Sequence, residues 1–171
     1  MGQRPVAALF GCSDSRLAAE IIFDLGLGDL FVVRNMGQII SDSVVASLEY
    51  ASDILDVSLI VVLAHDSCGA VQAAIDQESG SGAPLPPNIA AAVGEIVPAA
   101  RKVRETTGLG SGLPLDPEAV GRAHLKETIT NLLTTSELVS QRIADGKLAV
   151  IGATYTLSEG VVSADVIVGD L

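Results

Sequence analysis

The chain has 171 residues, 49% of them hydrophobic and 18% charged, which fits one globular domain spanning residues 1–171 and excludes a disordered chain. Its formal net charge of −11 argues against nucleic acid and against an anionic membrane surface as partners, because both require a surface rich in Lys and Arg. No apolar run reaches the roughly 18 residues of a membrane-spanning helix and the start carries no signal peptide, so we expect a cytoplasmic protein.

Apolar runs rich in β-branched residues predict the strands. None of the first four alternates polar with apolar residues, which is typical of strands buried on both faces of a parallel sheet. A fifth run, reached through the turn SEG at 158–160, predicts a C-terminal edge strand. The predicted strands are Val6–Phe10, Leu30–Val33, Leu59–Ala64, Leu148–Ala153 and Val161–Val168.

Helical periodicity fills the segments between these strands, and loops rich in Gly, Ser and Pro at 79–87 and 108–114 separate the longer helices. The predicted helices are Ser15–Leu25, Ser41–Leu55, Asp66–Gln77, Ile89–Thr106 and Pro117–Ala144. Alternation of strand and helix predicts an α/β fold with right-handed crossovers, in which helices flank a parallel four-stranded sheet of order 2-1-3-4. The fifth strand then lies at the C-terminal edge.

This topology makes a prediction about the two cysteines of the chain. Cys12 follows the first strand and Cys68 follows the third. Ligands of open α/β sheets bind at the carboxyl ends of the strands, where the strand order reverses. If strands one and three are neighbours, both thiols lie in one crevice. In a reducing cytoplasm a structural disulfide is not expected, so reactive, metal-bound and inert thiols remain the alternatives.

His65 and Cys68 are three residues apart, a common spacing for two ligands of one metal across a strand-to-helix turn. With Cys12 they offer two sulfurs and one nitrogen, a set that suits Zn²⁺ and leaves its fourth position open, as in catalytic zinc sites. The alternative is an inert cysteine and a merely hydrogen-bonded histidine. His124 lies in a helix with a polar face, and we expect it to be a surface or packing residue.

Asp14 and Arg16 complete the turn GCSDSR after the first strand. The carboxylate of Asp14 could reach a zinc ion held by Cys12, or Arg16 could hold it away in a bidentate ion pair that keeps it ionised. A carboxylate at a helix N-terminus beside a surface arginine is the alternative.

The segments CSDSR and HDSCG resemble the signature C-x-D-x-R and H-x-x-C-G of the β-class carbonic anhydrases. Three further blocks are similar to the family: GDLFVVRN at 28–35, SLEYA at 47–51, and Gly-Gln-x-Pro, whose glutamine lies nine residues before the first cysteine. The resemblance runs from Gln3 to Tyr155, which is most of the chain.

The resemblance implies the reversible hydration of carbon dioxide to bicarbonate and a proton by zinc-bound hydroxide. Cys12, His65 and Cys68 would hold the zinc. Asp14 and Arg16 would form a catalytic dyad that orients the hydroxide or gates it, with Asp14 on the zinc only in a closed state. The family's pocket draws on a neighbouring subunit, which implies a homodimer or homotetramer. The implied substrate-binding residues are Gln3, Phe31, Met36, Tyr50 and Gly69.

Three departures from the family pattern accompany this resemblance. Met36 stands where the family usually has Val or Ile, a change that conserves volume. Arg34 and Tyr155 match positions that hold inhibitory bicarbonate in some members, but that site also uses a Trp and this chain has none. Family members carry an N-terminal helical extension that packs across the partner. We expect this chain to lack that extension and therefore to form a less stable dimer.

Two other functions stay open on the sequence. A hydrolase acting on CS₂ or COS on the same scaffold would keep the zinc ligands and alter the pocket entrance. A non-catalytic zinc-binding or redox-sensing module, including an inactive truncated one, would bind zinc without turnover. A nucleotide-binding protein is disfavoured, because no G-x-G-x-x-G motif follows the first strand.

Overall fold

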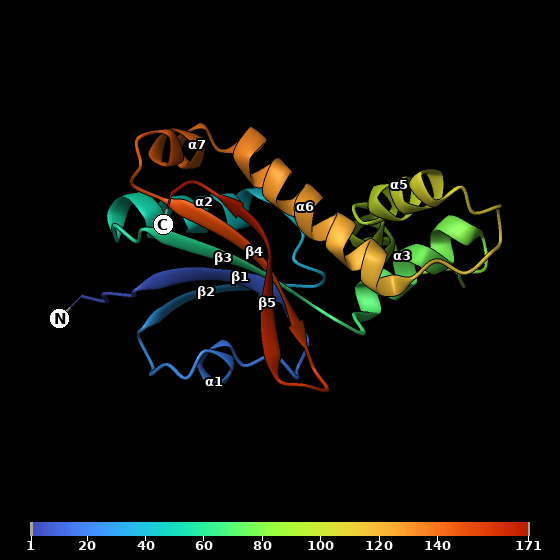
Figure 1. The fold of residues 1–171 in the computed structure, drawn as a ribbon, viewed down its shortest axis with the longest axis horizontal. Coiled ribbons are helices and arrows are strands. Elements are labelled where there is room, and N and C mark those ends of the chain that lie inside the picture. The colour runs from blue at the N-terminus through green and yellow to red at the C-terminus, as the bar shows by residue number, and fades with distance from the viewer. Residues whose placement is uncertain (1, 171) are drawn as a thin grey trace.

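The centre of the structure, a computed structural model that describes residues 2–170, is a five-stranded sheet in the order β2-β1-β3-β4-β5 (Figure 1). The first four strands are parallel and β5 runs antiparallel to β4. The predicted order 2-1-3-4 with a fifth edge strand is therefore confirmed. The strands are β1 (Ala7–Cys12), β2 (Leu30–Asn35), β3 (Leu59–His65), β4 (Ala149–Thr156) and β5 (Val161–Val168).

Burial explains the sequence pattern of the strands. All six residues of β1 are buried, as expected for a strand with neighbours on both edges and side chains packed on both faces. In β5 exposed and half-buried residues are mixed, because this strand closes the edge of the sheet. The strands β1 and β3 extend one or two residues beyond the predicted ends, so Cys12 and His65 are the last residues of their strands.

Helices connect the strands and pack on the sheet. They are α1 (Ala19–Ile22), α2 (Asp42–Glu49), the π-helical turn η1 (Tyr50–Ile54), α3 (Gly69–Ser79), α4 (Pro87–Gly94), α5 (Val97–Thr107), α6 (Pro117–Thr135) and α7 (Glu137–Ala144). The prediction over Ser41–Leu55 corresponds to α2 with η1, and the prediction over Asp66–Gln77 to α3. Within the described residues no helix is long and apolar enough to cross a membrane bilayer.

The helix predicted over Ser15–Leu25 is wrong for most of its length, since only the single turn α1 is helical. The reason lies in the residues before it. The Asp14 side chain accepts a hydrogen bond from the backbone N–H of Arg16 at 2.9 Å, so the chain forms a local turn there instead of a helix. Asp24 ends the segment with a φ of 52°, a left-handed conformation.

The two longest predicted helices are each two helices in the structure. The segment Ile89–Thr106 is divided into α4 and α5, because Pro98, in the first turn of α5, has no N–H to continue the hydrogen-bond ladder from α4. The segment Pro117–Ala144 is divided at Ser136, whose hydroxyl accepts a hydrogen bond from the N–H of Val139 at 3.1 Å and caps α7.

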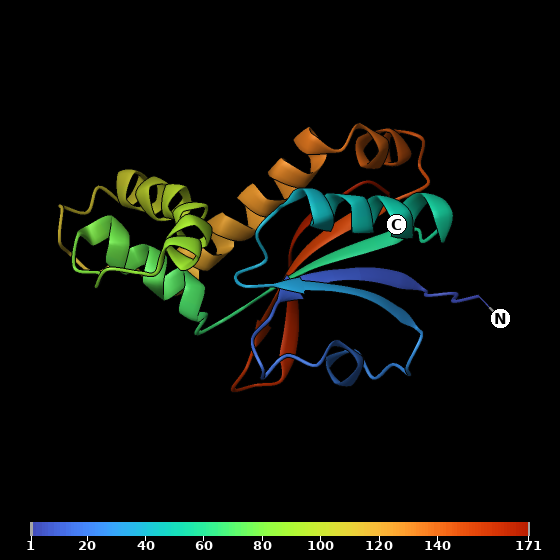
Figure 2. The same cartoon turned by 180° about the vertical axis from the view of Figure 1, so that it is seen from behind.

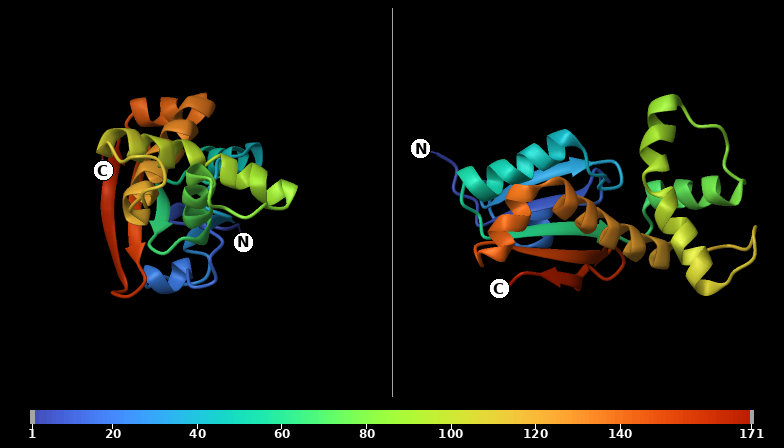
Figure 3. Two further views of the ribbon diagram at one scale, coloured as in Figure 1. Left: turned by 90° about the vertical axis from the view of Figure 1, so that its right-hand side faces the viewer. Right: turned by 90° about the horizontal axis from the view of Figure 1, so that it is seen from above.

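Three packed clusters arrange these elements. On one face of the sheet α2, α6 and α7 cover the central strands, whereas the other face carries α1 (Figures 1 and 2). Beyond the carboxyl ends of the strands, α3, α4 and α5 form a helical lobe that is joined to the sheet by the long helix α6 (Figure 3). Cys12 and Cys68 belong to the cluster under this lobe, so the site lies where sheet and lobe meet.

Candidate metal centre

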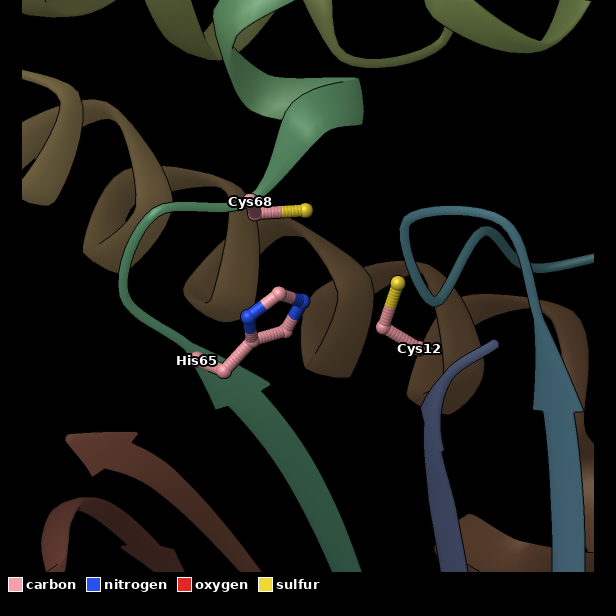
Figure 4. Close-up of side chains that lie close together, drawn as sticks. All are labelled: Cys12, His65 and Cys68. Atoms are coloured by element: carbon pink, nitrogen blue, oxygen red, sulfur yellow. The ribbon is translucent and has the colours of Figure 1, made fainter. Parts of the chain in front are cut away.

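Three buried side chains meet at the carboxyl ends of β1 and β3. Cys12 ends β1, His65 ends β3, and Cys68 directly precedes α3. Because β1 and β3 are neighbours, the three ligand atoms all lie within 4.8 Å of one another. In Figure 4 both sulfurs and the imidazole ring point into one shared space. The prediction that strand order brings both thiols into one crevice is confirmed.

His65 presents a free nitrogen to this space. Its Nδ1 lies 2.8 Å from the carbonyl oxygen of Asp66. Since a carbonyl only accepts, Nδ1 carries the proton and Nε2 keeps a lone pair. Nε2 is buried and has no hydrogen-bond partner among the described residues. A backbone carbonyl that fixes the tautomer in this way is typical of histidines that bind metals.

The two sulfurs shift each other's pKa. The neighbouring Cys68 lowers the pKa of Cys12 to about 4, against the opposing effect of burial. Cys12 in turn raises the pKa of Cys68, and burial adds to that rise. One sulfur is thus a ready thiolate, and the other holds a proton that a metal cation can displace. Two sulfurs and a bare imidazole nitrogen fit zinc, with one coordination position left for water or substrate.

Asp14 and Arg16 form a bidentate ion pair beside the triad. The Nε of Arg16 donates to Oδ1 of Asp14 at 2.8 Å, and Nη2 donates to Oδ2 at 2.7 Å. The same Nη2 donates to the carbonyl oxygen of Ser67 at 3.1 Å, which ties the pair to the turn before Cys68. These bonds hold the pKa of the Asp14 carboxyl well below its usual range. Its Oδ2 lies 3.9 Å from Nε2 of His65, so an ionised acceptor stands next to the metal position.

Comparison with known proteins agrees with this geometry. The model of the carbonic anhydrase family matches residues 7–162. The solved β-carbonic anhydrase CcaA superposes with a TM-score of 0.82 at 27% identity, over 99% of this chain and 79% of that one. The chain belongs to the β-class carbonic anhydrase family. It is a carbonate dehydratase by family, and Cys12, His65 and Cys68 are the zinc-site triad typical of that family.

Curated carbonic anhydrases are similar over most of their length. Carbonic anhydrase 2 of Mycobacterium tuberculosis is 46% identical over 161 residues, which is 93% of this chain and 73% of the relative. The carbonic anhydrase of Mycolicibacterium smegmatis is 43% identical over 171 residues, which is 99% of this chain and 79% of the relative. Among solved structures, a tetrameric β-carbonic anhydrase of Sordaria macrospora is 25% identical with a TM-score of 0.79, over 95% of this chain and 81% of that one.

The substrate-binding residues implied by the carbonic anhydrase resemblance lie in two places. Met36 and Gly69 line an open pocket of about 350 Å³ at the triad. Phe31 is near the start of β2, four residues and about 13 Å of extended strand before the end that reaches the triad. Tyr50 follows α2 with its ring centroid 6.1 Å from that of Phe31, and Gln3 precedes β1. One chain therefore brings two of the five residues to the metal position.

Two residues of this carbonic anhydrase site, Arg34 and Gly37, make hydrogen bonds that no sequence pattern predicted. Arg34 donates to the carbonyl of Cys12 at 2.8 Å and to that of Asp14 at 2.6 Å, so it holds the turn that carries these two residues. The backbone N–H of Gly37 donates to Sγ of Cys12 at 3.4 Å. A Cβ at Gly37 would lie 2.9 Å from side chains of Ala70 and Ile96, and its φ is +72°. Only the packed loop shows that glycine is required there.

Proposed function

We propose that this chain catalyses the reversible hydration of carbon dioxide to bicarbonate and a proton, with zinc held by Cys12, His65 and Cys68. The observation that carries the proposal is the buried cluster of two sulfurs and one bare imidazole nitrogen, in a chain of the β-class family. When bound there, zinc supplies a Lewis acid that lowers the pKa of a water toward about 7. The chain's own residues then position the reactants.

Asp14 and Arg16 take the role of an orienting dyad. The ionised Asp14 accepts a hydrogen bond from the attacking oxygen and so aims a lone pair at carbon dioxide. Arg16 donates to both carboxylate oxygens, which keeps the carboxylate charged and turned away from the metal position. Met36 and Gly69 form the wall against which the apolar substrate lies. If Asp14 leaves Arg16, the carboxylate can take the open position and close the site.

The remaining pocket residues support a shared site in a homodimer or homotetramer. Gln3, Phe31 and Tyr50 lie toward the amino ends of the strands, whereas the triad lies at their carboxyl ends. In the proposed dimer these three residues of one subunit complete the pocket of the other. Tyr50 is 44% exposed, so its ring is available to a second copy. A β-carbonic anhydrase among the structural neighbours is tetrameric.

The test of the proposed function is stopped-flow CO₂ hydration together with the zinc-to-chain ratio. We expect about one zinc per chain, turnover that stops when a chelator removes the metal, and recovery when zinc is restored. Zinc retained at that ratio without turnover would contradict the proposal and favour a non-catalytic module. Hydrolysis of COS or CS₂ without CO₂ hydration would assign another substrate to the same centre.

The shared site is tested by complementation between two inactive variants. Cys68→Ser damages a chain's own metal centre, and Gln3→Ala damages the pocket that the chain lends to its partner. After random subunit exchange in a mixture, about a quarter of all sites combine an intact metal centre with an intact Gln3. We expect activity to rise above that of either variant alone. A mixture without gain, or light scattering that shows a fully active monomer, would contradict the shared site.

A further inference from the structure

His124 of α6 is a buried histidine that the proposed chemistry does not use. Its side chain is packed inside the molecule, with 4% of the residue exposed. Its Nε2 lies 2.7 Å from the carbonyl oxygen of Gly37, so Nε2 donates the hydrogen bond. Its Nδ1 has no hydrogen-bond partner among the described residues. The expectation that His124 is a surface residue is wrong, and the alternative expectation that it is a packing residue is confirmed. In addition, the ring makes a specific hydrogen bond to the backbone of Gly37.

The loop that receives this bond has an unusual backbone. Gly37 has a φ of 72° and Gln38 a φ of 42°, so two successive residues are in the left-handed region. Asn35 ties the loop to itself through two bonds with the backbone of Ile39, at 2.7 and 2.8 Å. The bond from His124 is the contact that joins the Gly37 carbonyl to α6.

The other side of Gly37 faces the metal centre. Its N–H donates to Sγ of Cys12 at 3.4 Å, and the preceding residue, Met36, lines the pocket. An N–H that points at a thiolate withdraws charge from the sulfur and fixes its direction, as outer hydrogen bonds do for metal ligands generally. A chain of two hydrogen bonds therefore runs from His124 through Gly37 to Cys12.

A histidine is a costly choice for packing alone. A buried nitrogen without a partner is destabilising, and an apolar side chain of similar size would fill the same space without that penalty. Burial also lowers the pKa of His124, which keeps the ring neutral with its proton on the nitrogen that faces Gly37. The hydrogen bond to Gly37 is the interaction that an apolar side chain could not supply.

We propose that His124 is a positioning residue of the metal centre, which holds the Met36–Gln38 turn so that the N–H of Gly37 stays aimed at the Cys12 sulfur. The inference rests on the proposed zinc site. His124 contacts neither substrate nor metal in this proposal. It acts on the Cys12 sulfur only through the backbone of Gly37.

The test compares two substitutions of equal length. His124→Gln keeps an N–H donor at the position of Nε2, whereas His124→Met fills similar space without a donor. We measure zinc affinity by chelator competition and the thiolate-to-metal charge-transfer band of the cobalt-loaded protein. In the Met variant we expect zinc affinity to fall about 10-fold or more, and the band to move to longer wavelength because the sulfur loses a donor. In the Gln variant we expect the zinc affinity and the wavelength of the band to be close to those of the wild type.

Thr130→Val is the matched control on the same helix, because the Thr130 side chain is exposed and its hydroxyl donates to the carbonyl of Lys126 within α6 and not to the Met36–Gln38 turn. It should leave the band unchanged. Equal affinities and bands in the Gln and Met variants would overturn the inference and leave His124 a packing residue. If the Met variant does not fold, His124→Asn, whose amide stops short of Gly37, replaces it in the comparison. Wild-type chain that binds zinc but lacks turnover would overturn the proposed function and leave this comparison valid.

Discussion

Cys68→Ser is expected to remove zinc from the chain and to lower CO₂ hydration at least about a thousandfold, because without the metal no water in the site ionises near pH 7. A serine hydroxyl stays protonated and binds zinc far more weakly than a thiolate does. The two remaining ligands, Cys12 and His65, do not make a three-ligand site. Zinc content measured beside stopped-flow turnover checks both parts of the expectation.

Ser15→Ala serves as the control for this substitution. Ser15 is exposed, lies in the turn between Asp14 and Arg16, and its side chain makes no hydrogen bond within the described structure. It should keep its zinc and its turnover. The expectation fails if Cys68→Ser retains a full complement of zinc, since the third ligand would then have to come from another residue.

The second large effect is expected for Arg16→Met, which should keep zinc but lose turnover by about 100-fold or more, the range typical of a lost acid–base partner. The substitution removes both side-chain donors that hold the Asp14 carboxylate. The carboxylate, already 3.9 Å from the free nitrogen of His65, is then able to turn onto the metal position. Arg16→Lys keeps the charge but not the two parallel hydrogen bonds, so it should retain intermediate turnover.

The pH dependence of these variants separates the dyad from the metal. Arg16 lowers the pKa of Asp14. The Asp14 carboxylate is therefore fully ionised above the ordinary aspartate pKa of about 3.9, and its contribution to turnover is lost only as pH falls through the lowered pKa. In wild type, a fall in turnover between about pH 9 and pH 5 therefore belongs to another group. In Arg16→Met, where the carboxylate can turn onto the metal position, hydroxide competes with it for that position, so the residual turnover should rise with pH more steeply than in wild type.

Wild-type turnover in Arg16→Met would contradict the role of the dyad. A loss of zinc in that variant would instead assign Arg16 to the folding of the turn, through its bond to the carbonyl of Ser67. Measuring zinc content in every variant distinguishes these outcomes from the loss of a ligand.

The sequence alone determined the sheet and the ligand set. Apolar runs mark buried strands because both faces of a parallel sheet exclude water, and this requirement is local to each strand. Strand order then brought Cys12 near His65 and Cys68, because the carboxyl ends of neighbouring parallel strands meet at one edge. The motifs that carry the resemblance lie at these same strand ends. Zinc binding and the family were therefore predictable without coordinates.

Helix ends were harder to predict, because periodicity extends across breaks that single residues cause. Pro98 and Ser136 each divide a segment whose apolar pattern continues on both sides. The Asp14 side chain replaces the first turns of a predicted helix with a local hydrogen bond to Arg16. In each case a backbone hydrogen bond lost or gained at one position outweighs the pattern of its neighbours.

Only the tertiary structure decided how the centre is supported. Gly37 and His124 are 87 residues apart, and no local pattern connects a glycine in a loop with a histidine on a distant helix. Their contact exists because α6 crosses the loop where the helical lobe joins the sheet (Figure 3). Phe31 and Tyr50 are separated from the triad because they lie toward the amino ends of the strands, whereas the triad lies at the carboxyl ends. Short sequence motifs were enough to predict which residues bind the metal. The hydrogen bonds that support these residues depend on packing between segments that are distant in the sequence.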